Sequence, residues 1–292
     1  MRIGAVEAGG TKIICAVVNE KGEILERGRI DTLTPDETMP EIIRFFRGKE
    51  IEALGVACFG PIDLNRESET YGYILKTTKL EWIDHDFLTP LKKEFGIPVG
   101  FDTDVNGSVL GEVTFGSSRG MKDVVYITIG TGVGMGVYTG GVLLHGAAHP
   151  EAGHIRLTRH PKDDYAGCCK YHGSCIEGLA SGSAMRGRWK KRGEELSDND
   201  EAWELEAFYL AQTVCDLTYT YAPQRIIMGG GIMHKDGLIS MVKKETLRQN
   251  DGYSVLISAD TIDDYLVLPS LKDDQGILGA AVLGLEALKE MG

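Results

Sequence analysis

Apolar residues in the first sixty positions recur mainly with the two-residue period of β-strands. Ile3–Val6, Ile13–Asn19 and Ile24–Ile30 show this pattern and predict a β-meander. Thr38–Arg47 instead carries apolar side chains at helical spacing, and Ala53–Cys58 is a short apolar run typical of a buried strand. Mixed strands and helices of this kind predict an α/β fold.

The same kinds of element follow and then restart near residue 123. Apolar spacing predicts a strand at Val99–Asp102 between helices at Leu88–Phe95 and Val105–Val113. The restart consists of a strand, a glycine turn and a second strand: Asp123–Ile129, Gly130–Gly134 and Gly136–Thr139. Because Ile3–Thr11 and Val124–Gly132 both run from a strand into a glycine turn with threonine, the sequence indicates an internal repeat.

Three further segments complete the pattern. Arg225–Met228 is strand-like and runs into Gly229-Gly230-Gly231, which makes a third strand–glycine turn. The polar residues of Gly193–Asn199 predict a surface loop between helices. The Ala/Leu-rich segment Gly276–Glu290 predicts a helix.

Composition narrows the class of protein. The 292 residues are 42% hydrophobic and 25% charged, which is ordinary for a globular chain. No apolar run reaches the roughly 18–20 residues that span a bilayer, and the strand pattern at the N-terminus argues against a signal peptide. The net charge of -12 disfavours nucleic acid as a partner. Cys15, Cys58 and Cys215 lie in apolar stretches, so buried thiols and a cytoplasmic setting are expected.

The glycine turns are candidates for binding phosphate. Glycine lets the backbone approach an anion closely, so that successive N–H groups can point at it. Neither Gly9–Lys12 nor Gly130–Gly134 fits the P-loop or the Rossmann fingerprint. A hairpin turn is the alternative for any one of them, because glycine is routine there. Three turns in matched context favour a nucleotide.

Glu151–Glu177 concentrates potential metal ligands. Cys169, His172 and Cys175 form a C-x2-H-x2-C run, and His154 precedes it by fifteen positions. Sulfur and imidazole at this density favour tetrahedral zinc. Two alternatives concern the ligand set, since Cys168 is adjacent to Cys169 and His160 lies within the stretch. A disulfide between Cys169 and Cys175 is disfavoured in a reducing compartment.

These motifs together resemble a known family. Glu7-Ala8-Gly9-Gly10-Thr11-Lys12, Ile129–Gly134 and Met228–Gly231 resemble the two phosphate motifs and the adenosine motif of actin-like sugar kinases. The cysteine–histidine stretch is similar to that of ROK kinases, and within them to the bacterial fructokinase branch. The resemblance runs from residue 3 to about residue 285.

The resemblance implies a two-lobed actin-like or hexokinase-like fold with ribonuclease H-like lobes and a zinc-binding insertion. Residues 1–115 are expected to form the N-terminal lobe, to which the helix 276–290 returns. Residues 116–275 are expected to form the C-terminal lobe, which contains the zinc motif 154–175. In such kinases ATP lies mainly against the second lobe and sugar lies in the hinge, and the lobes close around the sugar.

The resemblance also implies site residues. The nucleotide contacts are Gly9, Gly10, Thr11, Lys12, Thr131, Gly132, Gly229, Gly230 and Gly231. Glu7 stands where most relatives carry an aspartate near Mg2+, so it is expected to hold the ion through water. Zinc is expected on His154, Cys169, His172 and Cys175 in a structural role.

Asp104 matches the catalytic base. From the residues alone it is equally a helix N-cap, and Asp102 is a competitor. Thr103 stands where glucose-phosphorylating relatives usually carry asparagine, which weakens a glucose assignment. Glu151, His154 and Glu177 match the contacts to sugar hydroxyls.

The implied activity is ATP-dependent phosphorylation of D-fructose at its 6-hydroxyl. Other hexose specificities (glucose, mannose or N-acetylmannosamine) are the first alternative, and a non-catalytic sugar sensor or repressor is the second. The repressors of this family carry a DNA-binding domain before the kinase-like body, for which a phosphate motif at residue 4 leaves no room. We therefore expect small-molecule partners, no nucleic acid, no membrane and, as is usual in the family, a homodimer.

Overall fold

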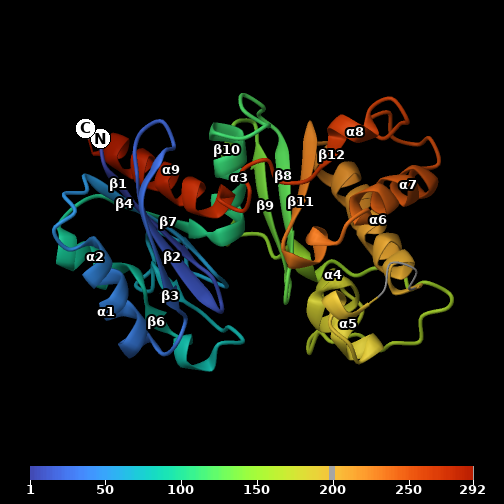
Figure 1. Ribbon diagram of the computed structural model, residues 1–292, viewed down its shortest axis with the longest axis horizontal. Helices are drawn as coiled ribbons and strands as arrows, with labels where there is room; N and C mark the ends of the chain where they lie inside the picture. The colour runs from blue at the N-terminus through green and yellow to red at the C-terminus, as the bar shows by residue number, and fades with distance from the viewer. Residues whose placement is uncertain (197–200, 292) are drawn as a thin grey trace. The chain divides into compact units, whose positions relative to one another are not determined.

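The computed structural model describes residues 1–196 and 201–291, which form two compact units (Figure 1). Unit 1 comprises Met1–Gly120, Leu143–Pro150 and Ser270–Gly292, and unit 2 comprises Met121–Val142 and Glu151–Pro269. Of the expected polar loop at 193–199, Gly193–Glu195 forms a 3-10 turn (η3), and residues 197–199 lie outside the described residues.

Unit 1 is built on a five-stranded sheet of order β3-β2-β1-β4-β7. The meander of β1, β2 and β3 is antiparallel, whereas β4 and β7 pair with β1 and with each other in parallel. The strands are β1 (Ile3–Ala8), β2 (Lys12–Val18), β3 (Ile24–Asp31), β4 (Ala53–Cys58) and β7 (Val99–Thr103), with a short hairpin of β5 (Tyr73–Ile74) and β6 (His85–Asp86). The helices are α1 (Pro35–Phe46), α2 (Leu88–Phe95), α3 (Asp104–Thr114) and α9 (Gln275–Glu290).

Strand alternation assigns the two faces of this sheet to different helices (Figure 1). One face of β1 and β4 carries Val6, Leu54 and Val56, which join a core cluster with residues of α1 and α2. The other face is covered by α9, whose backbone comes very close to β4 and β7. A Cβ at Gly55 would lie 2.6 Å from Gly284 N. Glycine is therefore what lets this helix lie directly on the sheet.

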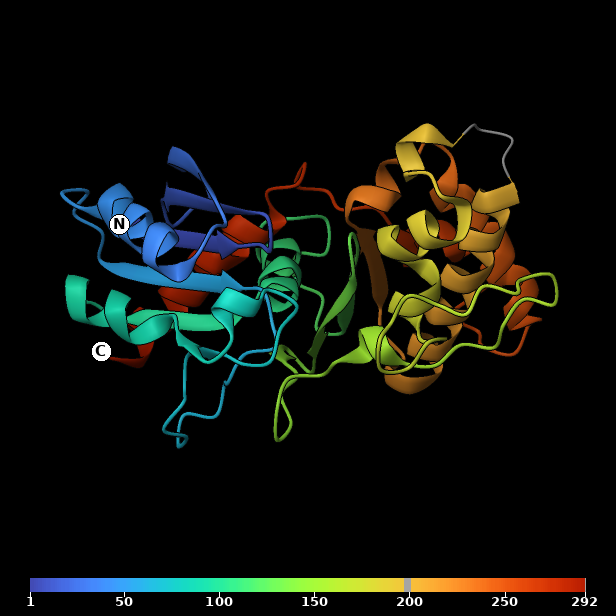
Figure 2. The ribbon, with the colours of Figure 1, turned by 90° about the horizontal axis from the view of Figure 1, so that it is seen from below.

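Unit 2 contains a second five-stranded sheet, of order β10-β9-β8-β11-β12. Its strands are β8 (Val124–Ile129), β9 (Val133–Thr139), β10 (Val142–Leu143), β11 (Arg225–Gly229) and β12 (Leu266–Val267). Its helices are α4 (Ile176–Ala180), α5 (Gly182–Trp189), α6 (Glu201–Tyr221), α7 (Leu238–Asn250) and α8 (Ile262–Tyr265). Helices α6 and α7 pack together on one side of the sheet (Figure 2).

The strands and helices predicted from apolar spacing are confirmed, with differences at their ends. Strand β9 starts at Val133 rather than Gly136, because its first residues already pair with Ile129 and Thr128 of β8. Helix α1 starts at Pro35 rather than Thr38, because Thr34 and Glu37 form a capping box ahead of it. None of the helices in the described residues is long and apolar enough to cross a membrane.

Candidate active site

The first glycine turn joins β1 to β2 in unit 1. Gly9 N–H donates to the Lys12 carbonyl at 3.0 Å, and the Thr32 hydroxyl donates to the Gly9 carbonyl at 2.7 Å. These bonds tie the turn from both sides, and Thr11 and Lys12 are exposed at its tip. The predicted nucleotide-contacting residues of this turn therefore present a hydroxyl and an ammonium group to solvent.

Glu7 lies at the end of β1, on the sheet face that α9 covers. A Cβ at Gly276 would lie 2.6 Å from Glu7 Cδ, so the carboxyl group occupies the space that a side chain at 276 would need. Burial raises the pKa of Glu7 to about 7, and the Asp104 carboxylate adds to the rise while Lys12 opposes it. The charges of Glu7 and Asp104 therefore oppose one another within unit 1, and a cation beside Glu7 would relieve this repulsion.

The corner between β7 and α3 places Asp104 at the first position of a helix. Thr103 is the N-cap, because its hydroxyl accepts from Asn106 N–H at 3.2 Å. Asp104 Oδ1 accepts from Val105 N–H at 2.9 Å. The helix N-terminus stabilises a negative charge there. Asp104 is thus held as an acceptor at the start of a helix, as a base requires, whereas Thr103 is only 4% exposed and is used as a cap.

Asp102, the competitor for the role of base, is buried and hydrogen-bonded. Its Oδ1 accepts from Thr103 N–H and from the Asn106 side-chain amide, each at 2.7 Å, and its Oδ2 lies 2.8 Å from His145 Nε2. Its side chain is 5% exposed. A carboxylate committed to these donors is not free to take a proton from a substrate. Sequence reasoning missed His145, whose only local signal is that a second histidine, His149, lies four positions later.

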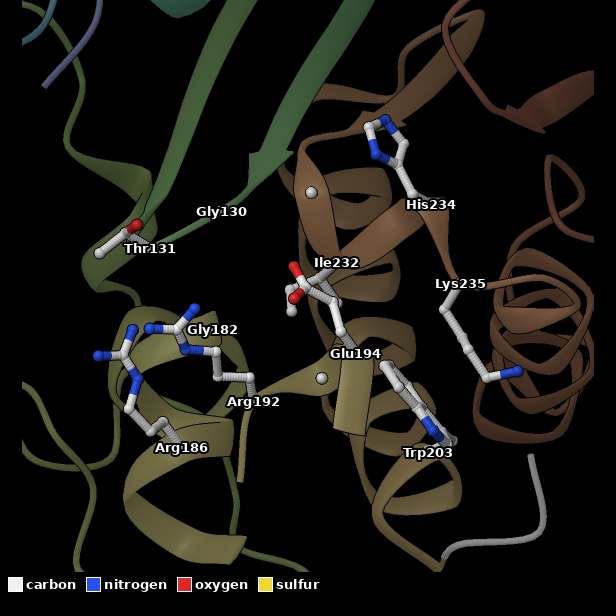
Figure 3. A pocket seen from close by; sticks show the side chains of 12 residues that line it. Gly130, Thr131, Gly182, Arg186, Arg192, Glu194, Trp203, Ile232, His234 and Lys235 are labelled. Carbon is white, nitrogen blue, oxygen red and sulfur yellow. The ribbon is translucent and has the colours of Figure 1, made fainter. Parts of the chain in front are cut away.

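In unit 2, the second and third glycine turns lie at one pocket of about 630 Å³, shown in Figure 3. Gly130 and Thr131 follow β8, and Gly231 follows β11. Gly230 has a φ of 89°, and a Cβ on it would lie 2.5 Å from the Ile129 carbonyl oxygen, so only glycine fits this turn. A pocket of this volume with a glycine-rich wall is of a size to hold a nucleotide.

Cationic side chains line the same pocket and were not predicted from the sequence. Arg186 and Arg192 lie near Thr131, and Lys235 lies on the far side beside Trp203 (Figure 3). The Lys235 ammonium is 5.6 Å from the centre of the Trp203 ring. Arginine and lysine recognise phosphate oxygens, so these residues complement the glycine turns. The only sequence signal was the basic run from Arg186 to Arg192.

Glu177 lies against the second glycine turn. Its Oε2 accepts from Val133 N–H at 3.3 Å, and a Cβ at Gly132 would lie 2.5 Å from that oxygen. Glycine at 132 therefore gives the carboxylate its place beside the turn. Glu177 is the second residue of α4, whose N-cap is Cys175. Glu151 occupies the position before the short 3-10 turn η2 (Ala152–His154), which carries His154, and its side chain makes no capping hydrogen bond to that turn.

The four predicted zinc ligands lie together. The ligand atoms of His154, Cys169, His172 and Cys175 all lie within 4.8 Å of one another. His154 Nδ1 is 3.7 Å from Cys169 Sγ and 3.6 Å from Cys175 Sγ, and His172 Nδ1 is 3.7 Å from Cys169 Sγ. A nitrogen and a sulfur that share a tetrahedral zinc are separated by roughly 3.6 Å. The donor set and its spacing therefore fit zinc.

The neighbouring cysteine and histidine stay outside this cluster. Cys168 Sγ lies 3.5 Å from the Glu177 carbonyl and 3.7 Å from the Ser181 hydroxyl. His160 packs edge-on against Phe208, with the centres of the two rings 4.7 Å apart. Burial raises the pKa of the Cys175 thiol to about 12, so a thiolate at this position needs a cation beside it. The six cysteines are free thiols, and no disulfide links Cys169 to Cys175.

Comparison with known proteins gives the class. The model of the ROK family matches residues 3–287, so the chain belongs to this family. It is 44% identical over 288 residues to a putative fructokinase of Bacillus subtilis, and the alignment covers 98% of this chain and 96% of that protein. It is 42% identical to a fructokinase of Zymomonas mobilis, over 97% of this chain and 96% of the relative.

A solved structure agrees on the fold. The ROK glucokinase of Streptomyces griseus, determined in complex with glucose and AMPPNP, superposes with a TM-score of 0.77 at 25% identity. The superposition covers 98% of this chain and 100% of the glucokinase. The hexokinase-like α/β fold predicted from the sequence is therefore confirmed.

Proposed function

We propose that this protein is a fructokinase that transfers the γ-phosphoryl group of ATP to the 6-hydroxyl of D-fructose. The observation that carries the proposal is the identity of 42–44% over almost the whole chain to relatives named fructokinases. The pocket lined by the glycine turns supports a nucleotide as one substrate. We further propose that units 1 and 2 are the two lobes of the kinase, and that the protein is cytoplasmic and dimeric as its family suggests.

Asp104 is the proposed catalytic base. It accepts the proton of the fructose 6-hydroxyl as the sugar oxygen forms a bond to the γ-phosphorus and the bond from that phosphorus to the β,γ-bridging oxygen breaks, which releases ADP. Its place at the first position of α3, where Val105 N–H reaches its Oδ1 at 2.9 Å, supports this role because the carboxylate stays an acceptor. Glu7 is the proposed carboxylate on the Mg2+ side, and the ion when bound neutralises charge on the phosphate oxygens.

Glu151, His154 and Glu177 are the proposed contacts to sugar hydroxyls. Thr103, whose hydroxyl also caps α3, is the fourth proposed contact. A carboxylate accepts from hydroxyl groups, so two glutamates suit a polyol. His154 offers Nδ1 to the cysteine cluster, which leaves its Nε2 to carry the proton. We propose that zinc on His154, Cys169, His172 and Cys175 is structural and fixes the direction in which this imidazole donates.

A coupled ADP-release assay over fructose, glucose, mannose and N-acetylmannosamine tests the substrate. We expect fructose to give the highest kcat/KM. A higher value for any other sugar would contradict the fructose assignment while leaving a ROK hexokinase in place.

Asp104→Asn tests the base in the same assay. The amide cannot take the proton, so we expect turnover to fall by about 10²–10⁴-fold while fructose binding is kept. Asp31→Asn is the matched control, since it changes an exposed carboxylate of the same unit in the same way. Turnover that survives in Asp104→Asn would remove Asp104 from this role.

A further inference from the structure

Helix α3 begins beside a cluster in which Asp102 and Asn106 are buried and the His145 side chain, 38% exposed, covers them from the solvent side. Asp102 accepts on Oδ1 from the Asn106 side-chain amide at 2.7 Å, and its Oδ2 faces His145 Nε2 at 2.8 Å. Because a carboxylate oxygen accepts, the imidazole carries a proton on Nε2 and donates it. The hydrogen bond to Asp102 raises the pKa of His145, and partial burial opposes this rise.

The first turn of α3 depends on the same cluster. Asn106 is held twice, since its backbone N–H donates to Thr103 Oγ1 at 3.2 Å and its side chain donates to Asp102. Asp104 lies between Thr103 and Asn106, and its carboxylate accepts from Val105 N–H within this turn. A shift of Asp102 therefore moves the residues on both sides of Asp104.

Only one of these partners of Asp102 comes from outside the corner. Thr103 and Asn106 belong to the junction of β7 and α3, whereas His145 comes from Leu143–Pro150, 43 positions after Asp102. Burial raises the pKa of Glu286 of α9, Lys289 opposes this rise, and the charge of Asp102 adds to it. His145 is therefore the partner of Asp102 that can be changed without altering the corner itself.

We propose that His145 is a positioning residue for phosphoryl transfer. Through Nε2 it holds the Asp102 carboxylate, and Asp102 in turn holds the helix turn that presents Asp104. The inference rests on the proposed role of Asp104 as base. Loss of the imidazole leaves a carboxylate that is 5% exposed without its donor on Oδ2. Such a group reorganises its surroundings to find another donor, and the nearest donors are those that fix the first turn of α3.

Three substitutions separate the hydrogen bond from the bulk of the side chain. His145→Gln keeps an N–H near the position of Nε2, His145→Asn moves it to the position of Nδ1, and His145→Leu removes it. Because a displacement of about 1 Å at a catalytic group can cost about 10²-fold, we expect kcat to fall roughly 10–100-fold in the Leu and Asn variants. We expect KM for ATP to change by less than about twofold and His145→Gln to retain most of the turnover.

The Asp102→Ala background tests whether His145 acts through Asp102. If it does, His145→Leu adds no further loss in that background, because no side-chain acceptor remains at residue 102 for the imidazole to hold. Equal losses in both backgrounds overturn the proposal, as does full turnover in His145→Leu. A rise in KM for the sugar with unchanged kcat also overturns it, since this indicates direct substrate contact.

Controls keep the result distinct from misfolding and from a failure of the proposed function. Thermal unfolding of each variant shows whether the fold is retained. His85→Gln changes another histidine of unit 1, one that packs edge-on against Trp82 at 5.3 Å, and should leave kcat unchanged. An active Asp104→Asn enzyme refutes the base itself. An inactive Asp104→Asn enzyme together with a fully active His145→Leu enzyme refutes only the role of His145.

Discussion

Gly276→Ala tests how the Glu7 carboxyl group is held in place. The added Cβ would lie 2.6 Å from Glu7 Cδ and 3.1 Å from Glu7 Cγ. Carbon atoms in ordinary contact lie about 3.5–4.0 Å apart, so one of the two groups must move by roughly 1 Å. Which group moves decides whether the effect is on the fold or on the chemistry.

Helix α9 is in close contact with the sheet beneath it. Cβ atoms at Gly55 and Gly100 would lie 2.6 Å from the backbone of α9, at Gly284 N and at Leu283 C. Moving the helix outward would give up this contact along its length, so the flexible end of Glu7 is the part that yields. Alanine also has the higher helix propensity, by about 0.5–1 kcal/mol, which offsets part of the steric cost to stability.

We therefore expect Gly276→Ala to keep its melting temperature within a few degrees and to lose about 10–100-fold in kcat. The assay is ADP release at saturating fructose and ATP, repeated over a range of Mg2+ concentrations. Glu7→Asp shortens the side chain by one methylene group, so the double variant Gly276→Ala/Glu7→Asp should be more active than Gly276→Ala alone.

Gly284→Ala is the matched control on the same helix. Its Cβ would lie 2.9 Å from Gly55 N, so it should lower stability without any rescue by Glu7→Asp. Equal losses of kcat for Gly276→Ala whether residue 7 is Glu or Asp would refute the steric reasoning.

The remaining predictions concern unit 2. Cys175→Ser or His172→Ala should release zinc, measured by mass spectrometry of the purified protein, and lower the melting temperature, whereas Cys168→Ser should retain the metal because its sulfur lies outside the cluster. Arg192→Gln should raise KM for ATP about tenfold with little change in KM for fructose, because it removes a charged donor from the pocket, and Lys190→Gln is the control. Glu206 is 1% exposed, and burial raises its pKa to about 8 while Arg188 opposes the rise. Between the ordinary value of 4.5 and about 8 the folded state therefore binds the extra proton, and the free energy of unfolding falls by about 1.4 kcal/mol per pH unit as pH rises. Glu206→Gln should remove this loss, so its gain in stability over the native protein, measured by denaturant unfolding, should be larger at pH 8 than at pH 5.5; an equal gain at both values would contradict the assignment.

Local patterns were enough to predict much of the fold and part of the site. The periods that distinguish strands from helices can be read within a few neighbouring residues, and each glycine turn is a short continuous motif. The metal cluster was also predictable, because His154 and Cys175 are close in sequence and their residue types have few other uses in combination. These features depend on neighbours along the chain, which a single sequence displays.

Features that depend on distant pairs were not predictable in this way. Asp102 and His145 are 43 positions apart, and no spacing rule indicates which loop returns to the start of α3. The fit of Glu7 against Gly276 depends on which face of β1 meets α9. The pocket residues Arg192 and Trp203 come from separate segments that only tertiary folding brings together. Each of these contacts is set by packing rather than by local sequence.

The division of the chain between the two units has a consequence for how the protein is made. Unit 1 includes both the first strand and α9, and α9 covers β1, β4 and β7 of its sheet. During synthesis this helix emerges after every residue of unit 2. The N-terminal sheet therefore lacks α9 on one of its apolar faces until the end of synthesis. Every segment of unit 2, by contrast, is synthesised before α9. Unit 2 can therefore complete its fold before unit 1, which is the reverse of the usual order from the N-terminus. The sheet face that α9 later covers is where a chaperone is expected to bind.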